Sequence, residues 1–328
     1  MRRLLCRSLS TALLLTLTGL LAFGCAGSRR SDDDEDEGPR VRKTVRPQAA
    51  QLKPVKATEY GVIRGMVTWD GALPNMDQLA EELKKSMSAN SDHQYCLTGK
   101  KPDDPADYQS TIQPFETTQQ EYRIGDNKGL GNVMVWIEPP DGHYFEVPKD
   151  QLDAVAKEVR LTQPHCAFLP HCTVLFPSYR KDGAETPTGQ KLIVDNDARV
   201  AHNANIKKPL SGTDNVLIPP TQKREYVMPV EKGFITVGCD VHKWMSAYLR
   251  AFDHPYAAVT SVGGDAAKKV WEDRKAPAFG SFEIKGVPVG AKVKLVVWHE
   301  KLGYLTGQKG KELTLKKENV ENFSAGQK

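Results

Sequence analysis

Residues 238–245 of this 328-residue chain read GCDVHKWM. The stretch places the thiol of Cys239, the imidazole of His242 and the thioether of Met245 within seven residues. A second imidazole, that of His202, lies 37 residues upstream of the cysteine. One thiolate, two imidazoles and a weakly bound thioether are the ligand set of a mononuclear blue-copper site. The sequence therefore predicts one copper ion of type 1, and with it one-electron chemistry.

Predicted strands on both sides place this loop at one end of a sheet. Residues 234–238 predict a strand that leads into the loop, and residues 247–252 predict a strand that leaves it. A third strand over residues 191–195, followed by a turn, leads toward His202. Taken singly, each residue also has a structural interpretation: the cysteine as a buried thiol or half of a disulfide, the methionine as a core side chain, each histidine as a satisfied polar group. The combination of all four favours the metal site.

Short apolar runs separated by Gly, Pro and Asn predict strands along most of the chain. They lie at residues 61–69, 132–137, 159–161, 173–176, 191–195, 224–228, 234–238, 247–252, 281–284 and 293–298. Helical spacing predicts only two short helices, at residues 79–87 and 150–159. Residues 97–120 are polar, contain proline and predict irregular structure. Many short strands with turn residues between them are typical of an all-β sandwich.

The ligand motifs resemble those of the cupredoxin family. Residues 200–203 (VAHN) and 239–245 (CDVHKWM) carry the resemblance, and the spacing within the second matches amicyanin-like members. Further motifs are similar to a group of exported bacterial plastocyanin-like proteins: FLPH at 168–171, DND at 195–197, DHPYAAVT at 253–260 and VWHE at 297–300. The resemblance covers residues 158–300, nearly half of the chain. It implies a cupredoxin-like Greek-key β-sandwich, which we place at residues 151–254.

The resemblance also implies roles for single residues. His202 and His242 would be the equatorial imidazole ligands, Cys239 the thiolate and Met245 the axial thioether of one type 1 copper ion. Asn203 would hold the loop that bears the first histidine.

His171 is a candidate further ligand. Ordinary cupredoxins have no ligand there, so this residue either packs beside the site or binds a second ion. The chain also crowds two histidines and two cysteines into residues 165–172, which suggests a second zinc or copper site. Structural zinc sites use two paired clusters, however, and only one such cluster is present in the sequence.

A one-electron carrier is the function that the resemblance implies. The edge of His242 would be exposed as the electron port, and Trp244 with residues 255–256 would form an apolar contact surface for a redox partner protein. Two other functions remain open: copper storage or delivery, and a structural surface lipoprotein with a vestigial copper site. The sequence has no trinuclear-copper His-x-His pairs, catalytic triad, paired carboxylates or Gly-rich phosphate loop, so it does not predict an enzyme.

A second resemblance concerns the two ends of the folded sequence. Residues 280–298 are similar to the closing strands of carboxypeptidase-regulatory-like β-sandwich modules, and residues 61–69 and 132–137 to the opening strands. We therefore expect residues 58–145 and 255–325 to form one discontinuous β-sandwich, with the cupredoxin inserted between the two segments. The alternative is a single cupredoxin with long additions.

The first 25 residues predict export. A basic start, a short apolar core and a glycine directly before Cys25 resemble a bacterial lipoprotein signal, with Cys25 as the lipidated residue. The alternative is an ordinary signal peptide that is cleaved nearby. Residues 26–57 combine a run of acids with a basic, Pro-containing stretch and predict a disordered charged tether. The expected location is the periplasm or cell envelope, with a lipid anchor in the membrane.

Export permits disulfides. Outside Cys25 and Cys239, the exported part has three cysteines, Cys96, Cys166 and Cys172, which allow one disulfide and one free thiol. We favour the pair Cys96–Cys166, although sequence spacing leaves the other pairings open.

Net charge argues against nucleic acid as a partner. The formal charge of +4 includes three arginines within the predicted signal peptide, and removing those three charges leaves +1. A nearly neutral protein lacks the basic surface that phosphate binding needs.

Overall fold

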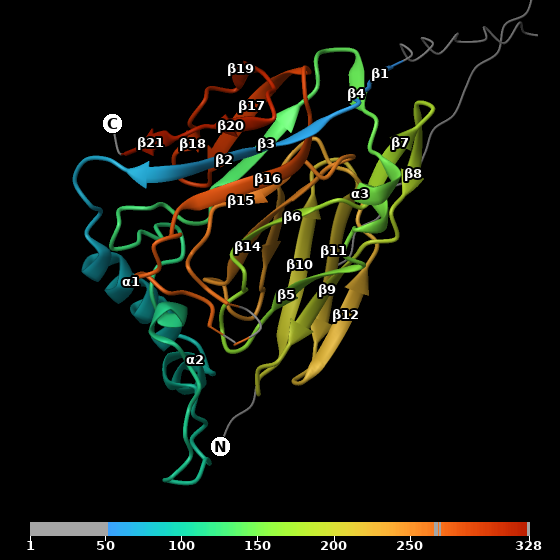
Figure 1. Ribbon diagram of the computed structural model, residues 1–328. Coiled ribbons are helices and arrows are strands. Elements are labelled where there is room, and N and C mark those ends of the chain that lie inside the picture. The colour runs from blue at the N-terminus through green and yellow to red at the C-terminus, as the bar shows by residue number, and fades with distance from the viewer. Residues whose placement is uncertain (1–51, 266–267, 269, 327–328) are drawn as a thin grey trace, which may run out of the picture. The chain divides into compact units, whose positions relative to one another are not determined.

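The computed structural model describes residues 52–265, 268 and 270–326 (Figure 1). The predicted signal peptide, Cys25 as the predicted lipidation site, and residues 26–51 of the predicted tether lie outside these residues. The described part consists mainly of strands, so the expected all-β sandwich class is confirmed. None of its helices has the length and apolar character that a membrane crossing requires.

The first sandwich contains the predicted copper loop. Its larger sheet has the strand order β11-β10-β13-β14-β6, and its smaller sheet has the order β12-β9-β5. The bounds of these strands are β5 (Glu158–Thr162), β6 (Cys172–Leu175), β9 (Lys191–Asn196), β10 (His202–Lys208), β11 (Gly212–Ile218), β12 (Gln222–Tyr226), β13 (Ile235–Gly238) and β14 (Ser246–Ala251). Along β14 buried and half-buried residues alternate, as expected for a strand with one face on a core. Fully buried Leu192 and Val194 from one sheet meet Ile206 and Leu249 from the other.

The second sandwich is built from both ends of the described chain. One sheet has the order β15-β3-β17-β18 with β19 also on β17, and the other has the order β16-β2-β20 with β21 also on β2. The bounds are β2 (Tyr60–Trp69), β3 (Met134–Glu138), β15 (Ala257–Val259), β16 (Ser281–Pro288), β17 (Lys292–His299), β18 (Gly303–Tyr304), β19 (Lys311–Thr314), β20 (Glu318–Val320) and β21 (Phe323–Ala325). Gly65 on β2 lies so close to the chain at Glu321 that an added Cβ would be 1.7 Å from its carbonyl oxygen. Only glycine therefore fits where β20 and β21 meet this strand.

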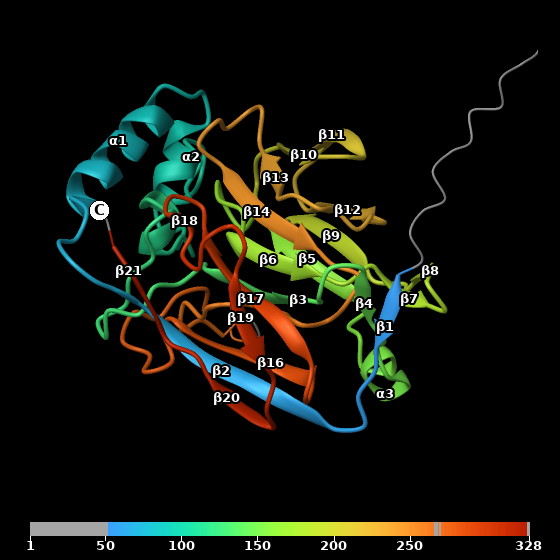
Figure 2. The ribbon, with the colours of Figure 1, turned by 90° about the horizontal axis from the view of Figure 1, so that it is seen from above.

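The sheet containing β3 and β17 is buried on both faces. One face, with Val135 and Leu295, joins the core of the second sandwich. The other face, with Trp136 and Trp298, forms a separate apolar cluster with Cys172 of β6. Strands covered on both sides have nearly continuous apolar sequences, which explains why these two carry no alternation. Figure 2 shows this stacking from above, with β3 and β17 between β2 on one side and β6 and β14 on the other.

The helical segments lie outside both sandwiches. Helix α1 (Met76–Ser88) begins where Asn75 accepts a hydrogen bond from the Gln78 amide at 3.1 Å, a regular N-cap contact. Helix α2 (His93–Thr98) ends at Gly99, whose φ of 68° is the left-handed cap conformation. The predicted irregular stretch after it contains one 3-10 turn, η1 (Pro114–Thr117). Figures 1 and 2 both place α1 and α2 together at one edge of the fold.

Two expectations need correction. The predicted helix over residues 150–159 is only α3 (Lys149–Asp153), because residues 158–162 pair in parallel with β9 as strand β5. The end of the predicted tether is ordered: β1 (Lys53–Val55) pairs with β4 (His143–Phe145), and Val55 packs on the second core. A hairpin of β7 (Ser178–Lys181) and β8 (Ala184–Pro187) completes the strands.

Candidate metal centre

The predicted ligand loop connects two adjacent strands of the first sandwich. Strand β13 ends at Gly238 and β14 begins at Ser246, so the ligand residues form a short turn at the end of an antiparallel pair. The Met245 amide donates to the His242 carbonyl at 2.9 Å and closes this turn. His202 is the first residue of β10, which pairs with β13. The sheet therefore brings a histidine from a distant part of the sequence beside the loop.

Three donor atoms converge at this end of the sandwich. The Nδ1 atoms of His202 and His242 are 2.9 Å apart, and the Cys239 Sγ atom is 3.9 Å from the first and 3.8 Å from the second. A first-row ion bound at about 2.0–2.3 Å allows two of its donors to be up to roughly 4.5 Å apart. All three donors therefore fit one ion. Met245 follows on the same loop and is buried, with 3% of its surface exposed.

The electrostatics of the two imidazoles also favour a cation. Burial, followed by the neighbouring His242, lowers the pKa of His202 to about 3, and burial lowers the pKa of His242 against the opposing effect of Asp92. Both rings are therefore neutral at neutral pH. Two bare Nδ1 lone pairs 2.9 Å apart repel each other unless a proton or a metal ion lies between them.

The Cys239 sulfur is held by backbone donors. The amides of Asn203 and His242 point at Sγ at 3.5 and 3.4 Å. Burial raises the pKa of the Cys239 thiol, and these amide contacts oppose the increase. Because a thiolate is the form that binds metal, we expect metal binding here to release a proton.

Asp240 fastens the loop to the sheet. Its carboxylate accepts hydrogen bonds from the side-chain amides of Asn203 at 3.0 Å, Asn205 at 3.1 Å and Asn215 at 2.7 Å. These contacts, with that of Asn215 the largest, lower the pKa of Asp240 to about 2. The Asp240 amide in turn donates to the Asn203 side chain. Asn203 therefore contacts both the sulfur and the 239–245 loop, whereas the expected role was to hold the loop that bears His202.

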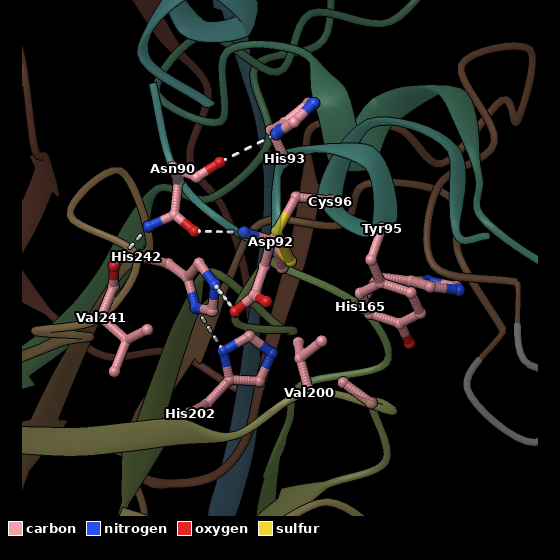
Figure 3. Close-up of a disulfide and its surroundings, with 12 residues drawn as sticks. Asn90, Asp92, His93, Tyr95, Cys96, His165, Val200, His202, Val241 and His242 are labelled. Atoms are coloured by element: carbon pink, nitrogen blue, oxygen red, sulfur yellow. Dashed lines mark hydrogen bonds and ion pairs between the residues drawn. A yellow bond between two sulfur atoms is a disulfide. The ribbon is translucent and has the colours of Figure 1, made fainter. Parts of the chain in front are cut away.

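The expected electron port is wrong as stated. The side chain of His242 is fully buried, because the segment that precedes α2 covers it (Figure 3). Its Nε2 atom lies 3.1 Å from a carboxylate oxygen of Asp92. Tyr256, expected on the contact surface, is also fully buried, in the core of the second sandwich. Trp244 and Pro255 are both half-buried, and the Trp244 indole donates to the Cys166 carbonyl at 3.1 Å.

The structure joins Cys96 of α2 to Cys166 in a disulfide, the pair favoured above. Both sulfur atoms lie within 4.8 Å of a donor atom of His242. The disulfide therefore attaches the covering segment next to the ligand loop. The sequence did not predict the contact between Asp92 and His242. The only signal for it was the expected disulfide of Cys96, four residues after Asp92 in the chain.

His171 does not join the donor cluster. It contacts the Ser246 carbonyl at 3.0 Å through Nδ1 and pairs with Glu300 through Nε2. His165 instead pairs with buried Glu116 at 2.9 Å, and Cys172 remains a free thiol whose pKa is raised by burial. The crowded residues 165–172 thus divide among separate partners. Within the described ranges, three-donor groups occur only at His202, Cys239 and His242 and at the disulfide with His242.

Comparisons with known proteins give structural neighbours only. No protein-family model and no curated protein matches the chain. Amicyanin from Paracoccus versutus (Thiobacillus versutus) is 16% identical, covering 35% of this chain and 97% of its own, with a TM-score of 0.23. A mutant amicyanin in the Cu(I) state is 11% identical over 35% and 98%, with a TM-score of 0.24. A purple cupredoxin from Nitrosopumilus maritimus is 13% identical over 30% and 100%, with a TM-score of 0.22.

Proposed function

We propose that this protein binds one type 1 copper ion and carries single electrons. The observation that carries the proposal is the convergence of the His202, Cys239 and His242 donor atoms, all buried and all within 4.8 Å of one another. Met245 on the same loop would be the weak axial ligand. A thiolate with two imidazoles and a thioether is the donor set that suits copper rather than the hard cations.

The chain supplies a rigid holder for such an ion. When bound, copper would supply the one-electron redox chemistry. Amide donors on the Cys239 sulfur and the carboxylate of Asp240 fix the ligand loop against β10 and β11. Full burial of His202 and His242 keeps water from the donors. Ligands that are held in place need little rearrangement when the ion's charge changes, which suits rapid electron exchange.

Copper storage or delivery is a second candidate. The cover over His242 favours it, because a store benefits from a shielded ion whereas a carrier needs an accessible ligand edge. A structural role with a vestigial site is the third candidate. The two copper functions differ in which oxidation state the site prefers and in how readily it exchanges electrons.

The visible spectrum of the purified protein separates these candidates. We expect added Cu(II) to produce an intense thiolate-to-copper band that saturates at one equivalent, bleaches with a mild reductant and returns with an oxidant. Tight, colourless binding of Cu(I) without a band in Cu(II) would support storage instead. Absence of binding in both states would leave the structural role.

Three further parts of this proposal concern location, partners and the second sandwich. We propose export with lipidation at Cys25, which mass spectrometry of the mature N-terminus tests; a chain that keeps Met1 would refute it. The partner would be another redox protein, and the protein itself would not be an enzyme.

Residues 58–145 and 255–325 would be a carboxypeptidase-regulatory-like module around a cupredoxin at 151–254. Limited proteolysis that releases a stable fragment of about these inner bounds would support that division.

A further inference from the structure

A segment outside both sandwiches contacts the proposed copper ligand directly. We call residues 89–99, which comprise the turn after α1 and helix α2, the cap. The Asn90 side chain donates to the Val241 carbonyl at 2.8 Å, and Asp92 meets His242 at 3.1 Å (Figure 3). The cap therefore contacts two neighbouring residues of the ligand loop.

The cap is anchored close to this contact by a disulfide and by hydrogen bonds. Cys96 is bonded to Cys166, and the Cys96 amide donates to the Asp92 carbonyl at 3.0 Å in the first turn of α2. The Tyr95 hydroxyl accepts a hydrogen bond from the Arg199 amide at 3.0 Å, close to His202 in the chain. Asp92 is thus fixed in position by its own helix and by a covalent link. Its side chain is 34% exposed, so its carboxylate stays in contact with solvent while one oxygen faces the buried ring.

The chemistry of the pair fixes the tautomer of His242. An ionised carboxylate can only accept hydrogen bonds, so the nitrogen that faces Asp92 must carry the proton. That nitrogen is Nε2, which leaves Nδ1 unprotonated. Nδ1 is the atom that faces the His202 ring and the Cys239 sulfur. The contact therefore selects the form of the ring that can bind an ion in the donor cluster.

We propose that Asp92 is a positioning residue for the copper ligand His242, which it holds in the Nδ1-binding tautomer and makes a stronger donor to Cu(II). The inference rests on the proposed function and extends it. A carboxylate behind a metal-bound imidazole increases the basicity of the ring and adds a negative charge near the ion, and both effects favour the more highly charged state. Asp92 would thereby lower the reduction potential of the site. The segment that covers the ligand would then also tune it.

The test compares three variants of the full protein. Asp92→Asn keeps the shape of the side chain but removes the charge, and Asp92→Glu keeps the charge. Asp107→Asn removes one negative charge from an exposed residue in the stretch that follows the cap. Near-ultraviolet circular dichroism shows that each variant is folded before the measurements are compared.

Two readouts are needed. In metal-free protein, the ¹⁵N shifts of the His242 ring report its tautomer, and we expect the protonated-Nε2 form in wild type, Asp92→Glu and Asp107→Asn but a mixture in Asp92→Asn. In copper-loaded protein, loss of such an outer contact weakens metal binding by about 10–100-fold. If the substitution weakens the binding of Cu(II) tenfold and leaves the binding of Cu(I) unchanged, the reduction potential of the Asp92→Asn protein rises by about 59 mV.

The outcomes separate this inference from the proposed function. If wild type forms no thiolate-to-copper band, the copper proposal fails, while the metal-free ¹⁵N shifts still decide whether Asp92 fixes the ring. If the band forms but Asp92→Asn matches Asp107→Asn in both tautomer and potential, the positioning role is wrong. A reduction potential that is raised in Asp92→Asn but keeps the wild-type value in Asp92→Glu would support it.

Discussion

The two sandwiches both bury histidines, but only one of them brings histidine nitrogens together. In the first, His202 and His242 face each other and a cysteine sulfur. In the second sandwich and beside it, His299 and His254 each accept one backbone hydrogen bond, from Lys301 at 3.3 Å and Tyr256 at 3.1 Å. Burial lowers the pKa of all three of His202, His254 and His299. A buried, neutral histidine is therefore common to both regions, and the convergence of several donor atoms is what distinguishes the candidate metal site.

Removal of the disulfide should cause the largest loss of stability. Both of its cysteines lie beside the candidate metal centre, so the loss concerns that region and not the second sandwich. The Cys96–Cys166 bond closes a loop with a sequence separation of 70. Replacing both cysteines with serine should lower the free energy of unfolding by roughly 4 kcal/mol. Denaturant unfolding measures the loss, and Cys172→Ser, which removes a free thiol, is the control. A loss below about 1 kcal/mol would mean that noncovalent contacts alone hold the cap.

Equivalent leucine-to-alanine substitutions in the two cores test whether both sandwiches support the geometry of the candidate metal centre. Leu249→Ala on β14 and Leu295→Ala on β17 each remove a fully buried leucine. Each should lower the free energy of unfolding by about 2–5 kcal/mol because a cavity remains. Since β14 borders the ligand loop, we expect only Leu249→Ala to broaden the electron paramagnetic resonance lines of bound Cu(II). Equal broadening in Leu295→Ala would show that the second sandwich also supports the site.

Acid should weaken the second region through its isolated histidines. Burial, the main cause, lowers the pKa of both His254 and His299 from 6.5 to about 4. The unfolded chain binds more protons than the folded chain between these values, so stability is lost as the pH falls from about 6.5 to about 4. The effect is at most roughly 3 kcal/mol for each histidine. Thermal unfolding at several pH values should show a smaller slope in His254→Gln than in wild type; an unchanged slope would contradict this account.

The smallest expected change concerns Met245, the proposed axial ligand. Met245→Leu should cost less than about 1.5 kcal/mol in stability, because the two side chains have similar volumes. It should keep the colour of the copper protein and shift the reduction potential, since the axial ligand tunes the site. Voltammetry measures the shift. Met228→Leu, at a buried methionine of the same core, is the matched control and should leave the potential unchanged.

Much of the fold could be predicted because local sequence determines it. Strands β2, β9, β13 and β14 match predicted segments to within about two residues, since their apolar and β-branched residues follow the strand pattern. The ligand loop could be found for the same reason, because three donors lie within seven residues between two such strands. The β7–β8 hairpin was missed although its Asp182-Gly183 turn has positive φ at both residues, a usual signal for a two-residue turn.

The missed features depend on contacts between distant segments. Strand β10 (His202–Lys208) reads HNANIKK, and its polar residues gave no strand signal because β11 and β13 supply its pairing. The cap over His242 could not be expected either, since Asp92 lies 150 residues before its partner in the chain. The burial of Trp136 and Trp298 could not be predicted either, because it depends on a second layer that covers the outer face of their sheet.

The two free thiols of the described chain allow the central claim to be tested most directly. Cys239 and Cys172 are both buried, but only Cys239 lies beside two imidazoles. The measurement is the visible absorption of Cu(II)-loaded Cys239→Ser and Cys172→Ser beside wild type. We predict an intense thiolate-to-copper band in wild type and Cys172→Ser and its complete loss in Cys239→Ser. A band that survives in Cys239→Ser would contradict the assignment of the metal centre.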